Sequence, residues 1–241
     1  MSTTETEKNT DSKKQQVESM FNSIAPKYDF LNHFLSMGID HLWRKKTIKQ
    51  LKSLNPKTML DVATGTGDLA ICALKNLNPD KITGIDISEQ MLEFGKKKLI
   101  ERKLNDKISL LQADSENIPF DDNSFNAITV GFGVRNFENL EKGLKEMRRV
   151  LTPGGKVAIL EFSKPRKFPI KQLYNFYFKY ILPTIGKIVS KDNRAYTYLP
   201  ESVSKFPDRE DFIAVLNNCG YQNARFISLS FGIASIYIAE K

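Results

Sequence analysis

The sequence has few of the residues that bind metals or form disulfides. It contains two cysteines, Cys72 and Cys219, and two histidines, His33 and His41. Each cysteine falls in a segment with helical spacing, so two buried thiols are expected, as in a reducing cytoplasm. The histidines have no cysteine partners and no HExxH pattern, and we therefore expect no metal site.

Long apolar runs are also missing. No stretch reaches the ~20 apolar residues that a bilayer-crossing helix needs, and no signal peptide is visible. We therefore expect a cytoplasmic protein. Residues 1–16 are polar and are predicted to form a disordered tail. Residues 17–241 are predicted to form a single domain with a substantial core.

The positive charge is concentrated in one part of the chain. Nine basic and two acidic residues lie between Phe162 and Pro207, so this segment carries +7 of the net charge of +8. A basic protein can bind nucleic acid. A basic segment that is also rich in aromatic residues suits an anionic membrane surface or an apolar substrate. We interpret 164–206 as a helical aromatic insertion of that kind; a helix buried under the following loops is the alternative.

The most informative motif is the stretch 60–68, LDVATGTGD. An apolar run precedes it and helical spacing follows it, so it predicts a strand, a tight glycine turn and a helix start. Gly65 and Gly67 allow the backbone to pass close to a ligand. Their spacing to Ala70 would also fit a dinucleotide site. Asp61 would repel a pyrophosphate, whereas it suits a ligand with ammonium and sulfonium groups, S-adenosylmethionine.

Strand and helix patterns alternate five times up to Phe162. Such alternation predicts a parallel sheet covered on both faces. Two further strands, joined at Phe231 and Gly232, predict a C-terminal hairpin whose last strand is antiparallel. The expected architecture is an α/β fold around a seven-stranded, mostly parallel sheet.

Two acids follow neighbouring strands of this sheet. Asp86 ends the second strand about 20 residues beyond the glycines, the position of a ribose-binding carboxylate. Asp114 follows the third strand, where an adenine amino group could be recognised; a turn cap is the alternative. Gly65, Asp86 and Asp114 should therefore meet at the carboxyl ends of the strands. Residues 17–54 predict a helical lid over this edge or, equally, two helices packed on the side of the domain.

Three stretches together resemble the menaquinone and ubiquinone biosynthesis C-methyltransferases. They are 28–36 with Trp43, 131–136, and 149–155 running on to 160–163. The sequence departs from the family pattern in places. Asp40 stands where some members have histidine, and Gly131 replaces a serine that contacts the cofactor in some members. Leu31 and Thr152 also differ, at positions where we expect little effect.

The resemblance implies a class I, Rossmann-like, S-adenosylmethionine-dependent methyltransferase. By position, Thr66 would meet the methionine end of the cofactor and Asp86 the ribose hydroxyls. Asp114 and Ser115 would contact the adenine, and Gly131 would contribute backbone only. The same pocket would be shaped by Asp61, Gly65 and Gly67.

The implied reaction is methylation of a ring carbon on a polyprenylated quinol. The family proposal makes Arg135 a base acting through water, but a guanidinium stays protonated. We expect Arg135 to stabilise the developing quinolate and Asn136 to hold a water or the second hydroxyl; an ion pair at the surface is the alternative for Arg135. Further candidates for the substrate pocket are Tyr28, His33, Tyr177, Tyr180 and Tyr198.

The stretches 61–67 and 38–40 look more like the menaquinone branch of the family, which favours demethylmenaquinol over a benzoquinol. The alternatives are a non-catalytic cofactor-binding scaffold, an RNA methyltransferase, and a small-molecule O- or N-methyltransferase. We expect no nucleic-acid partner and a peripheral contact with the inner face of an anionic plasma membrane. The sequence is compatible with a homodimer and does not specify one.

Overall fold

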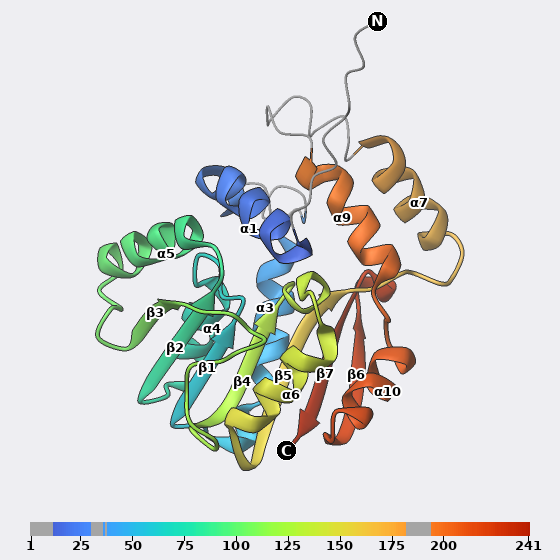
Figure 1. Cartoon of the computed structure of the whole chain (residues 1–241). Helices are drawn as coiled ribbons and strands as arrows, with labels where there is room; N and C mark the ends of the chain where they lie inside the picture. Colours follow the sequence, from blue (N-terminus) through green and yellow to red (C-terminus); the bar gives the residue numbers. More distant parts are fainter. Residues whose placement is uncertain (1–11, 30–35, 37, 182–193) are drawn as a thin grey trace, which may run out of the picture.

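A computed structural model of the chain describes residues 12–29, 36, 38–181 and 194–241. Figure 1 shows one mixed sheet with helices on both faces. The strand order is β3-β2-β1-β4-β5-β7-β6. The strands are β1 (Thr58–Val62), β2 (Lys81–Asp86), β3 (Ile108–Gln112), β4 (Phe125–Gly131), β5 (Leu151–Phe162), β6 (Gln222–Leu229) and β7 (Ala234–Glu240).

The first five strands are parallel, and β7 is inserted antiparallel between β5 and β6. The predicted seven-stranded sheet with a reversed last strand is therefore confirmed. β5 is the longest strand, because it begins at Leu151 and runs through Pro153–Gly155 to Phe162. Its pairing with β4 shifts register between Phe125 and Ala127, and this irregularity lets the strand continue through the glycines.

Buried apolar side chains on each face of the sheet pack against the helices that cover that face. The longer helices are α1 (Lys13–Ile24), α3 (Ile39–Lys49), α4 (Asp68–Leu77), α5 (Glu89–Glu101), α6 (Leu140–Val150), α7 (Ile170–Phe176), α9 (Arg194–Lys205) and α10 (Glu210–Asn218). Side chains of a strand alternate between faces, so Met59 packs with α3 and α4 through Ile48 and Leu69. Leu60 packs on the other face with α6 and α10, through Leu144 and Phe212.

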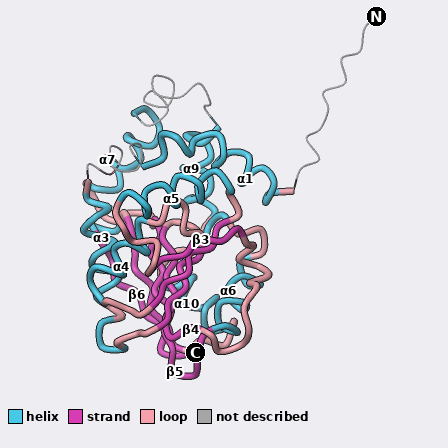
Figure 2. Tube along the Cα trace, turned by 90° about the vertical axis from the view of Figure 1, so that its left-hand side faces the viewer, coloured by secondary structure: helices cyan, strands magenta, loops and turns pink. Residues whose placement is uncertain are grey.

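Short helical turns complete the chain. They are η1 (Ala25–Lys27), η2 (Lys52–Leu54), η3 (Val134–Asn136), the π-helical η4 (Tyr177–Ile181) and η5 (Ser230–Gly232). The helices α1, α7 and α9 lie beyond the end of the sheet where β1, β2, β4 and β5 finish (Figures 1 and 2). The candidate site lies at this same edge.

The N-terminal helix begins earlier than the sequence pattern indicates. We expected disorder up to residue 16, but α1 begins at Lys13. Ser12 accepts a hydrogen bond from the Gln15 backbone N–H, and the Gln15 side chain accepts one from the Ser12 N–H. This capping box orders the polar first turn, and the buried Val17 anchors the helix.

The two helices of residues 17–54, which we expected either to form a lid or to pack on the side of the domain, lie in different places. α1 lies over the edge of the sheet, whereas α3 packs against α4 on a face of the sheet, with Trp43 and Ile48 buried. Within the described ranges, no helix combines the length and apolar character needed to cross a membrane.

Candidate functional site

The glycine turn after β1 has the conformation that the sequence predicts. Gly65 and Gly67 have positive φ angles of 55° and 83°, and Gly67 caps the N-terminus of α4. Ala63 shares this left-handed conformation at φ 52°, which is uncommon for a residue with a Cβ atom. Strain of this kind at a strand end is typical of functional turns.

Asp61 lies beneath this turn and not at the wall of the cavity. Its side chain is 1% exposed and accepts hydrogen bonds from Thr64 Oγ1 at 2.6 Å and Thr129 Oγ1 at 2.5 Å. Burial raises its pKa to about 6, although the two hydroxyls oppose the shift. We expected the Asp61 carboxylate to face a cationic ligand. The structure instead shows it fixing the turn from below, because both carboxylate oxygens are engaged by hydroxyls of the turn and of β4.

Asp86 ties the end of β2 to the glycine turn. Its carboxylate accepts hydrogen bonds from Gly65 N–H at 2.8 Å and Ser88 N–H at 2.9 Å. Burial raises the pKa of Asp86, and these backbone donors oppose the shift. The residue lines the cavity described next, so the predicted convergence of Gly65 and Asp86 is observed.

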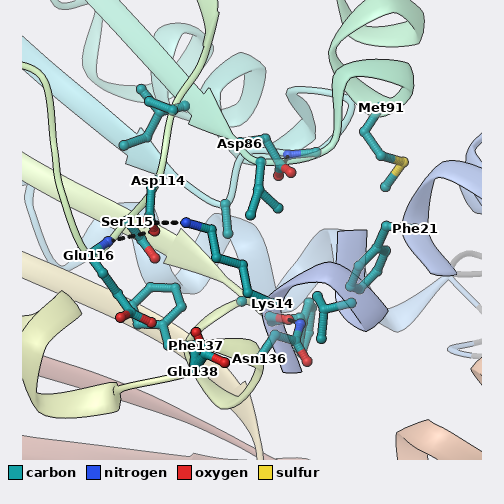
Figure 3. Close-up of a pocket in the computed structure, with 18 of the residues that line it drawn as sticks. Lys14, Phe21, Asp86, Met91, Asp114, Ser115, Glu116, Asn136, Phe137 and Glu138 are labelled. Atoms are coloured by element: carbon teal, nitrogen blue, oxygen red, sulfur yellow. Dashed lines mark hydrogen bonds and ion pairs between the residues drawn. The ribbon is translucent and has the colours of Figure 1, made fainter. Parts of the chain in front are cut away.

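A cavity that is partly open to solvent lies at the carboxyl ends of the strands (Figure 3). Polar side chains from several elements point into it, and apolar side chains from α1 and α5 cover the opposite side. The residues used below are Lys14, Phe21, Tyr28, Gly65, Asp86, Met91, Asp114, Ser115, Gly131 and Asn136.

Asp114 is occupied by a lysine from α1. Lys14 Nζ lies 2.5 Å from Asp114 Oδ2, and the Glu116 N–H donates to Oδ1 at 2.9 Å (Figure 3). Burial acts to raise the pKa of Asp114, but the hydrogen bonds from Lys14 and the Glu116 N–H and the positive charge of Lys14 together outweigh it, and the net shift is downward. The turn-cap alternative and the cavity position are thus both observed, since the same carboxylate caps its own turn and faces the cavity.

Thr66 lies in a second polar network, outside the residues that line the cavity. Its hydroxyl donates to Asp29 Oδ1 at 2.6 Å, and Lys98 Nζ donates to the Thr66 hydroxyl at 2.9 Å. Lys98 also pairs with Asp68 at 2.9 Å. Sequence reasoning missed Lys98 and Asp29, because no motif marks a lysine late in a helix. Gly67 likewise shapes the turn without lining the cavity.

Beyond β4, Arg135 forms a buried ion pair. Arg135 Nη1 lies 2.8 Å from Glu161 Oε1 near the end of β5, and the two side chains are 7% and 0% exposed. The guanidinium also donates to the Phe132 carbonyl and stacks over the Phe162 ring, 5.4 Å from its centroid. Burial raises the pKa of Glu161, and Arg135 opposes the shift. The alternative of an ion pair is therefore observed, in the interior and not at the surface.

Glu161 was missed as a site residue. The available signal was an acid inside an apolar strand, one residue before that strand ends. Charged side chains in such positions are rarely fully buried unless they are paired.

Asn136 connects the cavity to α9. It lines the cavity, and its Oδ1 accepts a hydrogen bond from the Tyr198 hydroxyl at 3.1 Å. Its Nδ2 donates weakly to the Phe132 carbonyl at 3.4 Å. Of the predicted catalytic pair, the structure thus places Asn136 at the cavity wall and Arg135 behind it.

The other predicted pocket residues are dispersed. Tyr28 lines the cavity. Tyr177 is half-buried and Tyr180 is 54% exposed in η4, and neither lines this cavity. His33 lies outside the described residues. In the described part of the chain, no group of three or more His, Cys, Asp or Glu residues could hold a metal ion.

The cavity has the groups that an adenosyl ligand requires. Asp86 offers carboxylate oxygens suited to ribose hydroxyls, and Asp114 and Ser115 offer polar contacts for a base. Phe21 and Met91 supply apolar walls. Gly131 approaches with backbone, and a Cβ atom there would lie 3.2 Å from Leu69. The residues therefore fit S-adenosylmethionine, and Asp61 supports the glycine turn beneath them.

Comparisons with known proteins point the same way. The model of the ubiE/COQ5 methyltransferase family matches residues 9–241. A demethylmenaquinone methyltransferase of Bacteroides fragilis is 49% identical, covering 95% of this chain and 94% of the relative. A protein of Geotalea daltonii named ubiquinone/menaquinone biosynthesis C-methyltransferase UbiE is 47% identical, covering 95% and 97%.

Solved structures share the fold at lower identity. A SAM-dependent methyltransferase from Aquifex aeolicus has a TM-score of 0.58 at 21% identity, covering 80% of this chain and 88% of that one. The [4+2]-cyclase SpnF has a TM-score of 0.62 at 16% identity, covering 96% and 97%. Because a cyclase shares the architecture, fold likeness alone does not identify the reaction.

Proposed function

Because this chain belongs to the ubiE/COQ5 methyltransferase family and is therefore an S-adenosylmethionine-dependent methyltransferase, we propose that it methylates a ring carbon of demethylmenaquinol. The observation that carries this proposal is the 49% identity, over nearly the whole chain, to a relative named for that reaction. The cavity at the carboxyl edge supports it, with carboxylates where the ribose and adenine would lie.

The cofactor supplies a methyl group on sulfonium, which is a good leaving group, so the protein has mainly to align the two reactants. Asp86, held by Gly65 and Ser88, is preorganised to accept hydrogen bonds from ribose hydroxyls. Asp114 and Ser115 would hold the adenine. Phe21, Tyr28 and Met91 line the cavity and would exclude water from the side of the cofactor that they cover.

The harder requirement is a nucleophilic ring carbon. Ionising a quinol hydroxyl pushes electron density into the ring, and the ring proton must leave after the methyl transfer. Arg135 would stabilise the negative oxygen, because its guanidinium stays charged beside the buried Glu161. Asn136, oriented by Tyr198, would hold a water or the second hydroxyl.

The direct test supplies the protein with labelled S-adenosylmethionine and either reduced demethylmenaquinone or its benzoquinol counterpart. We expect label in the naphthoquinol ring carbon. Label only in the benzoquinol would assign the ubiquinone branch, and label on oxygen would assign an O-methyltransferase. Binding of S-adenosylhomocysteine without transfer to either quinol would favour a non-catalytic scaffold.

We also propose that the protein meets its lipid substrate at an anionic membrane surface. Five apolar or aromatic side chains beside the sheet edge are strongly exposed: Phe168 (80%), Leu173 (61%), Phe176 (56%), Tyr180 (54%) and Phe231 (83%). Phe168 and Phe231 line one groove together with Arg166 and Lys167. Lys171 and Lys179 are exposed on the adjoining helical turns. We call these nine residues the aromatic–basic surface. Exposed aromatics interleaved with lysine and arginine favour the headgroup region of an anionic bilayer.

A further inference from the structure

One tyrosine hydroxyl of α7 is buried without a partner. Tyr174 points inward, and its ring packs 4.2 Å from the ring of Phe178. Its hydroxyl oxygen has no hydrogen-bond partner among the described residues. On the same helix Leu173 and Phe176 are exposed. A phenylalanine would fill this position equally well for packing, so folding alone gives no reason for a hydroxyl here.

Other buried tyrosines of this chain show what a structural hydroxyl looks like. Tyr221 donates to the Leu144 carbonyl at 3.0 Å, and Tyr237 accepts from the Arg209 N–H at 2.8 Å. Both hydroxyls are satisfied within the protein. Tyr174 lacks such a partner, and an unsatisfied buried polar group in a native structure requires an explanation, one of which is a molecule that binds there.

A second unpartnered donor lies at the same edge of the sheet. Arg135 follows β4, Tyr174 follows β5, and these strands are adjacent, with Gly131 paired to Leu160. Nη1 of Arg135 is engaged by Glu161, but its Nε is buried with no hydrogen-bond partner among the described residues. Burial raises the pKa of Tyr174, and the positive charge of Arg135 acts in the opposite direction.

We infer that Tyr174, together with Arg135, binds the quinol oxygen that becomes negatively charged during methyl transfer. This inference rests on the proposed function and deepens it by naming a donor that neither the motifs nor the cavity lining reveals. An ionised quinol oxygen has lone pairs for both donors, and it would satisfy two buried groups that the protein leaves unpaired. Tyr174 keeps its proton at neutral pH, because burial raises its pKa. It therefore acts as a hydrogen-bond donor to the oxygen and not as a base.

The assignment replaces Tyr177 and Tyr180 as the aromatic-segment tyrosines of the substrate pocket. Tyr180 is 54% exposed, and Tyr177 is half-buried on the next turn. From the sequence we named Tyr177 and Tyr180 as pocket candidates and did not name Tyr174, although the three residues follow one another at intervals of three.

The test is Tyr174→Phe in the full-length chain, which removes one oxygen and keeps the ring. We expect the melting temperature to stay unchanged or to rise, because an unsatisfied hydroxyl is lost. With reduced demethylmenaquinone, kcat/KM should fall by roughly tenfold or more, the scale of losing one hydrogen bond to a charged group. The affinity for S-adenosylhomocysteine, measured by calorimetry, should not change. The acid limb of the kcat profile should move to higher pH, because the quinol oxygen would ionise less readily.

Tyr221→Phe is the matched control. It removes a hydroxyl that is satisfied far from the site, so it should lower the melting temperature and leave kcat/KM and the pH profile as in the wild type. A Tyr174→Phe protein with wild-type kcat/KM and pH profile would overturn the inference, as would one that loses melting temperature while keeping its specificity constant. Failure of the wild type itself to methylate any quinol would instead refute the proposed function.

Discussion

Glu161 Oε1 and Arg135 Nη1 lie 2.8 Å apart in the interior, where β5 ends beside η3. Breaking a buried ion pair on one side leaves an uncompensated charge and costs roughly 3–5 kcal/mol, whereas replacing both partners can be nearly neutral. Any variant of Arg135 therefore changes stability as well as chemistry. The two effects have to be separated by design.

We predict that Arg135→Ala lowers both the melting temperature and the turnover with quinol, the latter by about 10²-fold, the scale of losing one positioned electrostatic donor. The double variant Arg135→Ala with Glu161→Gln should recover much of the stability, because no buried carboxylate is left unpaired. It should not recover turnover. Thermal denaturation and initial rates on the three proteins give both readouts. Recovery of activity in the double variant would show that Arg135 only supports the fold.

Removing Lys14 should change the affinity for the cofactor. Lys14 Nζ pairs with Asp114 Oδ2 at 2.5 Å, on the carboxylate that the family pattern assigns to the adenine. For Lys14→Met we predict binding of S-adenosylhomocysteine up to about fivefold tighter, because a partly exposed ion pair of about 0.2–1 kcal/mol no longer competes. Calorimetry at two salt concentrations should also show a weaker salt dependence than in the wild type.

The control is Lys96→Met, which breaks an exposed pair with Glu93 on α5. It removes the same charge and should leave the affinity for S-adenosylhomocysteine unchanged. Weaker binding by Lys14→Met would contradict the competition and would mean that Lys14 contacts the cofactor itself.

Tyr198→Phe tests the link between α9 and the cavity. Its hydroxyl donates to Asn136 Oδ1 at 3.1 Å, so the variant leaves that amide without its donor from α9. We predict a several-fold increase in the KM for quinol, corresponding to about 1 kcal/mol, with unchanged affinity for S-adenosylhomocysteine. Steady-state kinetics and calorimetry check the two quantities. An equal loss of both affinities would mean that Asn136 positions the cofactor.

The pH dependence of stability should reveal Asp61. Its pKa is raised to about 6 by burial, against a value near 4 in the unfolded chain. Because the folded protein holds this proton more tightly than the unfolded chain does, Asp61 stabilises the folded state at pH values below the pKa of the unfolded chain. This contribution to the free energy of unfolding is lost as the pH rises through about 6. Acidification from pH 7 to pH 5 should therefore stabilise the wild type relative to Asp61→Asn by on the order of 1 kcal/mol. Urea denaturation of both proteins measures this difference. A difference that stays constant with pH would show that Asp61 is not protonated in this range.

The sequence predicted a seven-stranded, mostly parallel sheet with a reversed last strand and the edge at which the cavity lies, because both follow from alternating periodicity and from the glycine turn. It also predicted that Gly65, Asp86 and Asp114 converge. It could not show which way a side chain points. Asp61 turns inward to two threonine hydroxyls, and this depends on Thr129 of β4, 68 residues away along the chain. The lysine on Asp114 and the carboxylate on Arg135 are likewise contacts between distant segments, and no local pattern encodes them.

The same limit applies to the aromatic segment. The sequence indicated a helical aromatic insertion over 164–206, yet it could not assign each ring to the interior or to solvent. In the structure Tyr174 is turned inward, while Leu173, Phe176 and Tyr180 are exposed. The contact between the Tyr174 and Phe178 rings is local, because the two residues lie four apart on one helical segment, whereas the burial of the Tyr174 hydroxyl is not encoded by that spacing.

The aromatic–basic surface gives the last prediction. Phe168 and Phe231 come from segments more than 60 residues apart, and they line one groove at 80% and 83% exposure. The double variant Phe168→Ser with Phe231→Ser should lose most binding to vesicles that contain anionic lipid. Burial of the apolar surface of the two rings in the headgroup region would contribute several kcal/mol to the binding free energy of the wild type, on the order of 2 kcal/mol for each ring. Ile100→Ser on α5, 64% exposed and outside this surface, is the control and should bind like the wild type. Flotation with neutral and anionic vesicles separates the aromatic contribution to binding from the electrostatic one.

The same double variant should keep its cofactor site, because the two rings lie apart from the cofactor cavity. S-adenosylhomocysteine should therefore bind it normally. The methylation rate with quinol in vesicles should fall, whereas the rate with a short-chain quinol in solution should not. Equal flotation of the double variant and the wild type would contradict the membrane contact.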